Sequence, residues 1–349
     1  KTPKTVSPLR KLYAGPPDTW PAPHVDDGVY PEEMGPLPEV TFPEDNPYTR
    51  EKAELGKMLF FEPRLSGSGQ IACASCHDPE LGWADGHRLA FGHNRQQGKR
   101  NAMSILNTAF FKDFFWDGRA ASLEHQVIFP MQDQREMNME LSAALERLNA
   151  SEGYRKLFKE VFGAEKIEIG HVQKALATFE RTVTSRESKF DRFAKGDSTA
   201  LNDQELLGLH LFRTKANCMN CHHGPLFTDG QFHNLGQSTF GRPSEDLGRF
   251  HITGDTADVG KFRTPSLRDV TYTGPYFHSG NVAELSEILD MYERGMPQVI
   301  PRKYRDHPLY PEKSDLLNSF PLNEKEKKAL LAFLKAISPR PHRVSPPDL

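Results

Sequence analysis

Hydrophobic residues recur at helical spacing in several separate stretches of this chain, with polar residues between them. The clearest is 323–337 (NEKEKKALLAFLKAI), where charged residues cover one face of the predicted helix. The opposite face is apolar and is formed by Leu330, Leu331, Phe333, Leu334 and Ile337. The same periodicity predicts helices over 141–149, 153–162, 168–184 and 283–294. Strand patterns are few and short, so we predict an all-α protein with long loops.

A further helical pattern occurs twice, and each copy ends in the same motif. Residues 54–77 (ELGKMLFFEPRLSGSGQIACASCH) and 206–222 (LLGLHLFRTKANCMNCH) both contain Leu-Gly-x-x-Leu-Phe, then a loop, then Cys-x-x-Cys-His. The loop is longer in the first copy. This repeat predicts one module used twice, with a domain around each copy.

The ends of the chain differ from the repeated part. Eleven of the 27 prolines lie in residues 1–47, which show little apolar periodicity. Because proline removes backbone donors and blocks helices, we expect residues 1–49 to form an extended arm. The predicted order is then a first domain over 50–187, a second over 188–321, and a C-terminal helix and tail over 322–349. We expect this last segment to pack back on the N-terminal domain.

Composition excludes some classes of function. The chain has 349 residues, which is enough for two hydrophobic cores. Its formal net charge of −3 gives no basic surface, so we expect no nucleic-acid partner. No apolar run is long enough to span a membrane.

The Cys-x-x-Cys-His motifs account for every cysteine in the chain. The thiols are Cys73, Cys76, Cys218 and Cys221, and the histidines that follow are His77 and His222. In a c-type haem site, two thiols bond to the vinyl groups and the adjacent histidine binds the iron. One zinc held by both cysteine pairs, or two redox disulfides, is the alternative. A histidine directly after both pairs favours two covalently bound c-type haems.

The compartment follows from this cofactor, because haem is attached to such motifs outside the bacterial cytoplasm. The sequence opens KTPKTVSPLR, which has no signal-peptide pattern. We therefore expect a periplasmic protein whose signal peptide has been removed.

Between and beyond the two motifs the chain resembles a known family. Over roughly residues 50–338 it resembles the di-haem bacterial cytochrome c peroxidase and MauG superfamily. The segments that carry the resemblance are GHNRQQGKRN, FWDGRAASLEHQ, FRTPSLRDVTYTGPYFHSG and the closing helix. The resemblance implies two cytochrome-c-like domains with one haem each. It also implies that the N-terminal haem meets peroxide and that the C-terminal haem handles electrons.

The resemblance implies roles for four residues near the first haem. Trp116 matches a tryptophan between the haems that can relay electrons, although a packed core aromatic is the alternative. Glu136 matches the acid that moves a proton between the peroxide oxygens. Its alternative is an exposed glutamate in a polar run. Gln126 and Pro130 match distal-pocket positions, as a hydrogen-bond donor and a shape element.

A calcium site between the domains is also implied by the resemblance. Asn101 matches a side-chain ligand, and Thr273 and Pro275 match ligands that bind through their carbonyls. Oxygen ligands suit Ca²⁺. Ordinary loop residues are the alternative.

The second axial ligand of the C-terminal haem separates the branches of this family. The peroxidases have a methionine there, whereas this chain has Tyr292 beside Met291. On a helix, one face carries Leu285, Ile288, Leu289 and Tyr292. Met291 falls about 100° away, so we predict Tyr292 as the ligand and keep Met291 as the alternative. A tyrosinate, as in MauG-like enzymes, stabilises high-valent iron, whereas methionine favours Fe(II).

Two more positions affect how peroxide reaches the first haem and how oxidation leaves the protein. His93 matches the peroxidases' removable sixth ligand on the first haem, and His87 is a weaker candidate. A bound His93 would block peroxide until the protein is reduced, and a plain surface histidine is the alternative. Ala216 stands where the resemblance to MauG places a surface tryptophan, so that exit route for oxidation is missing.

The predicted function is therefore an oxidoreductase that uses hydrogen peroxide to form a high-valent, bis-Fe(IV)-type state. That state would oxidise a periplasmic partner protein, at tryptophan, by long-range electron transfer. The alternative is a di-haem cytochrome c peroxidase that takes electrons from a small cytochrome c or copper protein. A pure electron-transfer cytochrome is a third possibility, but a carrier needs no distal acid such as Glu136. The sequence leaves monomer and homodimer open.

Overall fold

The computed structural model describes residues 8–298, 300–342 and 344–347. Residues 1–7 of the predicted arm, and residues 343, 348 and 349 of the predicted tail, lie outside the described part. Helices and short 3-10 turns supply most of the regular structure. The α-helices are α1 (Pro8–Leu12), α2 (Arg50–Phe60), α3 (Leu123–Gln126), α4 (Ile128–Gln132), α5 (Leu141–Ala150), α6 (Glu152–Phe162), α7 (Ile169–Thr182), α8 (Lys189–Ala194), α9 (Asp203–Arg213), α10 (Phe250–Thr253), α11 (Leu285–Glu293) and α12 (Glu324–Ala336).

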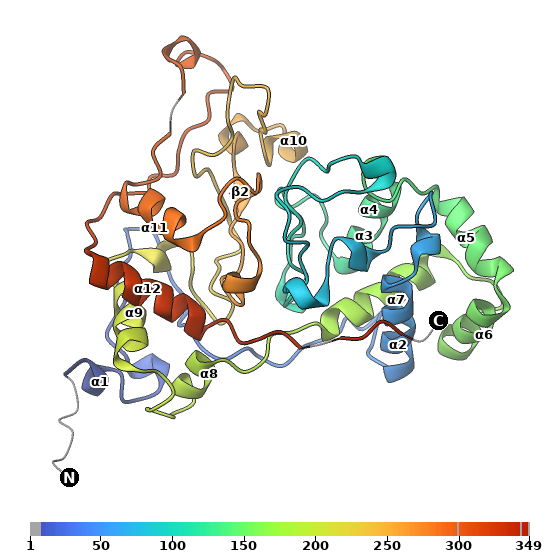
Figure 1. Ribbon diagram of the computed structural model, residues 1–349, viewed down its shortest axis with the longest axis horizontal. Coiled ribbons are helices and arrows are strands. Elements are labelled where there is room, and N and C mark those ends of the chain that lie inside the picture. The colour runs from blue at the N-terminus through green and yellow to red at the C-terminus, as the bar shows by residue number, and fades with distance from the viewer. Residues whose placement is uncertain (1–7, 299, 343, 348–349) are drawn as a thin grey trace.

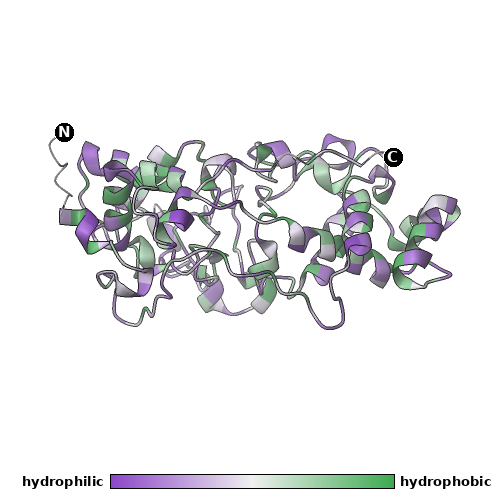
Figure 2. Cartoon of the chain, turned by 90° about the horizontal axis from the view of Figure 1, so that it is seen from below, coloured by the Kyte–Doolittle hydropathy of each residue, from purple (hydrophilic) through white to green (hydrophobic). Residues whose placement is uncertain are grey.

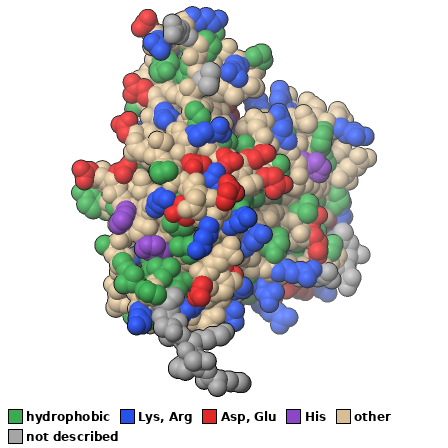
Figure 3. Space-filling model, turned by 60° about the vertical axis from the view of Figure 1, so that its left-hand side comes forward, with side chains coloured by type: hydrophobic (Ala, Val, Ile, Leu, Met, Phe, Trp, Pro, Cys, Tyr) green, Lys and Arg blue, Asp and Glu red, His purple; other side chains and the backbone are tan. Residues whose placement is uncertain are grey.

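The prediction of a mostly helical protein is confirmed. The helices expected from hydrophobic periodicity correspond to α5, α6, α7, α11 and α12. Two short strands, β1 (Phe232–His233) and β2 (Phe262–Arg263), pair antiparallel. Within the described part of the chain, no helix has both the length and the apolar character needed to cross a bilayer. Acidic and basic side chains are interspersed on the face seen in Figure 3.

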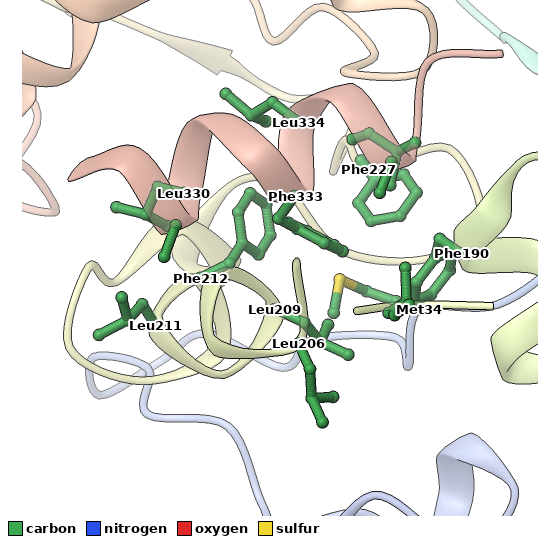
Figure 4. Packing of buried hydrophobic residues seen from close by; sticks show 14 of the residues in the cluster. Met34, Phe190, Leu206, Leu209, Leu211, Phe212, Phe227, Leu330, Phe333 and Leu334 are labelled. Carbon is green, nitrogen blue, oxygen red and sulfur yellow. The ribbon is translucent and has the colours of Figure 1, made fainter. Parts of the chain in front are cut away.

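The chain forms two lobes that lie side by side (Figure 1). Helices α2–α7 build the N-terminal lobe and α8–α12 build the C-terminal lobe, and each lobe has its own buried cluster. Figure 2 shows hydrophobic and hydrophilic residues alternating around single helices, as amphipathic helices require. In the C-terminal lobe, Phe212 of α9 packs against Phe333 of α12 with ring centroids 5.3 Å apart (Figure 4).

One helix crossing is built twice, and in both copies a glycine permits it. Gly56 in α2 lies against α7, where an added Cβ would overlap the Ala175 carbonyl oxygen. Gly208 in α9 lies against α12, where an added Cβ would overlap the Ala329 carbonyl oxygen and come within 2.7 Å of the Phe333 Cβ. The glycine of Leu-Gly-x-x-Leu-Phe therefore lets two helix backbones approach closely.

The prediction that the C-terminal helix packs on the N-terminal domain is wrong. Helix α12 packs on α9 in the C-terminal lobe, because its apolar face fills the place that α7 fills in the other lobe. Only the tail turns back, and there Val344 packs against the N-terminal cluster.

The proline-rich segment touches both lobes. Between α1 and α2 it contains one 3-10 turn, Pro17–Thr19, and otherwise no helix or strand. Glu33 forms an ion pair with Arg213, whose side chain is fully buried in the C-terminal lobe. Further along, Asn46 donates to a Glu124 oxygen of the N-terminal lobe at 2.7 Å.

Candidate functional site

We call residues 73–77 the first handle and residues 218–222 the second handle. In the second, the His222 N–H donates to the Cys218 carbonyl at 2.8 Å, which closes a tight turn. The His222 Nδ1 lies 2.9 Å from the Phe227 carbonyl oxygen. A carbonyl in this position holds the proton on Nδ1 and leaves the Nε2 lone pair for a metal. Burial lowers the pKa of His222, so the ring is neutral as a metal ligand must be.

The first handle has the same geometry in the other lobe. The His77 N–H donates to the Cys73 carbonyl at 3.0 Å, and the His77 Nδ1 lies 3.2 Å from the Trp83 carbonyl oxygen. Burial again lowers the pKa of the histidine. Each chain segment therefore presents one oriented imidazole beside two thiols.

The two cysteine pairs do not come together. Cys73 packs against the N-terminal cluster and Cys218 against the C-terminal cluster, so one zinc shared by all four thiols is excluded. Burial raises the pKa of each of the four thiols to about 12, so they are neutral rather than thiolate. All four are free, which leaves them available for thioether bonds.

A cavity opens beside the second handle, and its wall brings together many of the residues predicted from the sequence. Those residues are Asn101, Trp116, Cys218, Cys221, His222, Thr273, Pro275 and Tyr292. Much of the remaining wall is apolar and includes Leu267, Phe320 and Leu334. An oriented imidazole, two neutral thiols and a largely apolar wall fit a covalently attached haem.

Helix α11 supplies one wall of this cavity. Leu285, Ile288, Leu289 and Tyr292 all line it, as expected for one helical face. Met291 is not among the described residues that line it. Burial raises the pKa of Tyr292. No hydrogen bond to the Tyr292 hydroxyl is found within the described residues, so the phenol oxygen is available to a ligand.

Glu136 and His93 meet near the first handle. The His93 N–H donates to the Glu136 carbonyl at 2.7 Å. Burial, with a smaller contribution from Asp133, raises the pKa of Glu136 to about 7. The His93 Nδ1 is buried and has no hydrogen-bond partner among the described residues. A buried polar atom without a partner is costly, which fits a missing ligand at this place.

Pro130 and Gln126 lie on the short helices that lead to Glu136. The Met137 N–H donates to the Pro130 carbonyl at 3.1 Å, so the backbone ties Pro130 to the residue after Glu136. Gln126 lies in α3 one turn before Pro130, and its side chain is partly buried.

Trp116 lies where the two lobes meet. Its exposed fraction is 9%, and its Nε1 donates to the Asn101 carbonyl at 2.9 Å. The Arg263 N–H of the C-terminal lobe donates to the Trp116 carbonyl at 2.8 Å. The His278 ring, from the same lobe as Arg263, is 6.4 Å away in an edge-to-face arrangement.

The predicted calcium ligands are close to Trp116. Asn101, Thr273 and Pro275 share the cavity wall. The Asn101 side-chain nitrogen donates to the His87 carbonyl at 3.0 Å, and no donor to its side-chain oxygen is found among the described residues. The arrangement is compatible with an oxygen-rich cation site.

A second repeat, which sequence reasoning missed, relates the two sites. Asn107 and Asp269 both adopt a left-handed conformation before a 3-10 turn. Isolated bridges then close matching loops, Phe114 with Ala120 and Tyr276 with Val282. Each residue of the first segment is separated from its counterpart in the second by the same number of positions. The two segments can therefore be aligned without a gap, and the alignment can be continued into the helices that follow.

Continued at this offset, the repeat pairs Trp116 with His278 and Pro130 with Tyr292. Pro130 carries no side-chain donor atom for a metal, whereas Tyr292 carries a phenol oxygen. The two sites therefore differ at equivalent positions, because only Tyr292 offers a side-chain atom that can bind a metal. Aligning residues 107–130 with 269–292 would have revealed this from the sequence.

Sequence reasoning also missed a polar pair beside the second handle. His233 Nε2 lies 2.7 Å from an Asp229 carboxylate oxygen, and the Asp229 N–H donates to the Cys221 carbonyl at 2.7 Å. Their ligand atoms and the Cys221 thiol lie within 4.8 Å of one another. Since Cys221 belongs to the handle, we assign this group to the second site, where no sequence motif marks His233.

The chain is similar to known proteins in both sequence and structure. A family model described as di-haem cytochrome c peroxidase matches residues 50–199. The chain is 42% identical over 313 residues to the methylamine utilization protein MauG of Methylorubrum extorquens, covering 89% of this chain and 84% of that protein. It is 37% identical over 334 residues to the cytochrome-c peroxidase IdrP1 of Pseudomonas sp. strain SCT, covering 87% and 85%. A solved structure of a MauG-like protein associated with microbial copper homeostasis has a TM-score of 0.77 and 33% identity, covering 86% of this chain and 93% of that chain.

Proposed function

Because the chain belongs to the di-haem cytochrome c peroxidase family, which includes MauG proteins, we propose that it is a haem peroxidase-type oxidoreductase. In this proposal it uses hydrogen peroxide to oxidise a partner protein, at tryptophan, by long-range electron transfer. Two c-type haems would be held by Cys73 and Cys76 and by Cys218 and Cys221. One Ca²⁺ at Asn101, Thr273 and Pro275 and a location in the periplasm belong to the same proposal.

When bound, the haems supply an iron that binds peroxide and a store for two oxidising equivalents. His77 and His222 would hold the two irons, and the Trp83 and Phe227 carbonyls would keep the two imidazole rings oriented. On the open side of the first site, the Glu136 carboxylate takes a proton from one peroxide oxygen. It then gives this proton to the departing oxygen, which leaves as water.

Other residues shape the first site and connect it to the second. Gln126 is the proposed hydrogen-bond donor to peroxide, and Pro130 keeps the ligand position open because its side chain has no donor atom. Trp116 lies between the lobes and is the proposed station for electrons that pass from one site to the other.

The observation that carries the proposal is the position of Tyr292 in the cavity wall with His222 and both thiols of the second handle. A phenolate supplied by Tyr292 would stabilise an oxidised iron, whereas methionine would favour the reduced iron of an electron-accepting cytochrome. This favours storage of oxidising equivalents, as expected for a MauG-like enzyme.

A second candidate function rests on His93. Its Nδ1 is buried without a partner, and its backbone is bonded to Glu136. If His93 binds the first haem at rest, peroxide must wait for reduction, as in a cytochrome c peroxidase fed by a small cytochrome or copper protein.

One experiment separates the two. One equivalent of hydrogen peroxide is added to the diferric holoprotein, and visible and near-infrared spectra are recorded. A long-lived oxidised species with a near-infrared band from charge shared by the haems supports the MauG-like function. The cytochrome c peroxidase function is favoured if the wild type reacts with peroxide only after one-electron reduction. In that case His93→Ala should react without reduction, whereas His87→Ala should still require it.

A further inference from the structure

Two aromatic side chains of the proline-rich arm are buried against the lobe that carries the second handle. Tyr13 and Trp20 are 2% and 6% exposed, and their ring centroids lie 5.4 Å apart, edge to face. The neighbours of Tyr13 along the chain, Leu12 and Ala14, are exposed. Tyr13 therefore lies directly beneath the surface of the arm.

Contacts connect this pair of rings to the second handle. Met219, which stands between Cys218 and Cys221, is fully buried, and its sulfur lies 3.9 Å from the Arg213 Nη1. The Arg213 guanidinium carbon lies 5.4 Å from the centre of the Trp20 ring. Glu33 pairs with Arg213, so the positive charge beside Trp20 is offset. A line of close contacts thus runs from the handle through Trp20 to Tyr13.

Tyr13 has a base within hydrogen-bond distance. Its hydroxyl oxygen lies 3.0 Å from the His210 Nδ1. Burial lowers the pKa of His210, with further lowering by His24 and Arg213, so the ring is uncharged at neutral pH and can accept a proton. A phenol loses an electron far more readily when its proton can leave at the same time. Trp20 lacks this advantage, because its Nε1 donates to the Gly15 carbonyl, which is not a base.

We propose that Trp20 and Tyr13 form a redox relay from the second haem site to the surface of the arm, with His210 as the proton acceptor of Tyr13. The relay rests on the proposed function, in which peroxide is the oxidant. Tyr13 gives one electron, through Trp20, to the second site after peroxide has oxidised it, and the phenolic proton moves to the His210 Nδ1.

The cycle closes at the surface. The neutral Tyr13 radical takes one electron from an oxidisable aromatic side chain of a partner protein and recovers its proton from His210. Two such passages supply the two electrons that, with two protons, convert one hydrogen peroxide to two waters. Ala216 is 3% exposed, so the place of the surface tryptophan implied by the resemblance to MauG is small and covered here. The relay provides a different exit.

The test is electron paramagnetic resonance of the holoprotein, frozen after one equivalent of hydrogen peroxide, with haem spectra followed in parallel. Tyr13→Phe keeps the ring and removes the hydroxyl. Tyr30→Phe is the matched control, because Tyr30 lies in the same arm and is 90% exposed. We expect a tyrosyl radical in the wild type and in Tyr30→Phe but none in Tyr13→Phe. We also expect the oxidised haem spectrum of Tyr13→Phe to decay about tenfold more slowly, a difference of roughly 1.4 kcal/mol in the barrier.

The outcomes separate the relay from the proposed function. If the haem spectrum responds to peroxide but Tyr13→Phe keeps the radical and the decay rate, the relay is overturned and the proposed function stands. If the wild-type haem spectrum does not change on addition of peroxide, with or without prior reduction, both the relay and the proposed function are contradicted. His210→Gln keeps a polar partner but removes the base, so it tests the relay even if Tyr13→Phe loosens the arm. Radical formation at the wild-type rate in His210→Gln would contradict it.

Discussion

At the scale of single residues, burial of Glu136 sets the pH range of its proposed catalytic role. Its pKa of about 7, raised first by burial, means that the carboxylate proposed to take a proton from peroxide becomes protonated as the pH falls below 7. We expect Glu136→Gln to slow the reaction with peroxide by about 10²–10⁴-fold at pH 8 and to remove its dependence on pH near 7. Stopped-flow haem spectra measure both effects, and a wild-type rate in the variant would exclude Glu136 as the acid–base group.

Stability supplies a control for the same variant. The folded pKa of Glu136 lies above the ordinary 4.5, so folding is favoured while the group is protonated and loses this contribution as the pH rises from 4.5 to about 7. Glutamine has no charge to bury. Glu136→Gln should therefore be more stable than the wild type above pH 7, on the order of 1–3 kcal/mol. Slower chemistry in a more stable protein cannot be explained by misfolding.

Tyr292 gives the second prediction at this scale. Tyr292→Phe keeps the ring in the cavity wall but removes the phenol oxygen that is proposed to bind the second iron. We expect a change of spin state in the ferric haem spectrum and loss of the long-lived oxidised species. Met291→Leu is the control, since Met291 is not among the described residues of the wall. The opposite pattern, with Met291→Leu altering the spectrum, would make methionine the ligand.

The sequence predicted these residues unequally well. The handles and the α11 face that carries Tyr292 are local patterns, so spacing alone placed them. The Arg213–Glu33 ion pair and the Tyr13–His210 hydrogen bond join residues far apart in the chain, which no local pattern predicts. Trp116 was identified only by resemblance, because its neighbours come from both lobes.

At the scale of helices, the two glycine crossings make a prediction about packing. Gly208→Ala would push a methyl group into the Ala329 carbonyl, so α9 and α12 must separate. We expect a loss of about 1–3 kcal/mol in the free energy of unfolding, measured by denaturant titration of the holoprotein. Gly170→Ala in α7 is the matched control, because an added Cβ there meets nothing within 4 Å. That variant should gain up to about 1 kcal/mol from helix propensity. Equal effects in both variants would mean that close approach of α9 and α12 is not what Gly208 permits.

The same crossing explains which helix positions could be predicted. Periodicity identifies α12 as amphipathic but does not say which lobe covers its apolar face. The equivalence of Ala175 and Phe179 in α7 with Ala329 and Phe333 in α12 assigns it to the C-terminal lobe. The contacts of Gly56 and Gly208 with helices far along the chain show which lobe contains α12, whereas hydrophobic spacing does not.

At the scale of the whole molecule, polar contacts join the lobes around Trp116. Arg100 of the N-terminal lobe holds Asp246 of the C-terminal lobe through two hydrogen bonds of 2.7 and 2.8 Å. Its other nitrogen donates to Asp117 at 2.5 Å. Arg100 thereby links the loop that carries Trp116 to the opposite lobe, which fixes the geometry along any electron path between the two sites.

This link gives the last prediction. Burial alone would raise the pKa of Asp246, but Arg100 lowers it to about 2. The depressed pKa means that the pair stabilises the fold above pH 3.8 and that this contribution is lost as the pH falls toward 2. Asp246→Asn should therefore cost about 2 kcal/mol at pH 7, with a smaller difference from the wild type near pH 2.

The loosening should be visible between the lobes. The Arg263 N–H bonds to the Trp116 carbonyl across the boundary, so its hydrogen exchange reports local separation. We expect exchange at least about tenfold faster in Asp246→Asn, since each 1.4 kcal/mol is a factor of ten. Asp290→Asn is the control, because Asp290 pairs with Lys327 inside the C-terminal lobe. If hydrogen exchange of the Arg263 N–H is accelerated equally in both variants, the effect is general destabilisation. The Asp246–Arg100 pair then does not hold the two sites together.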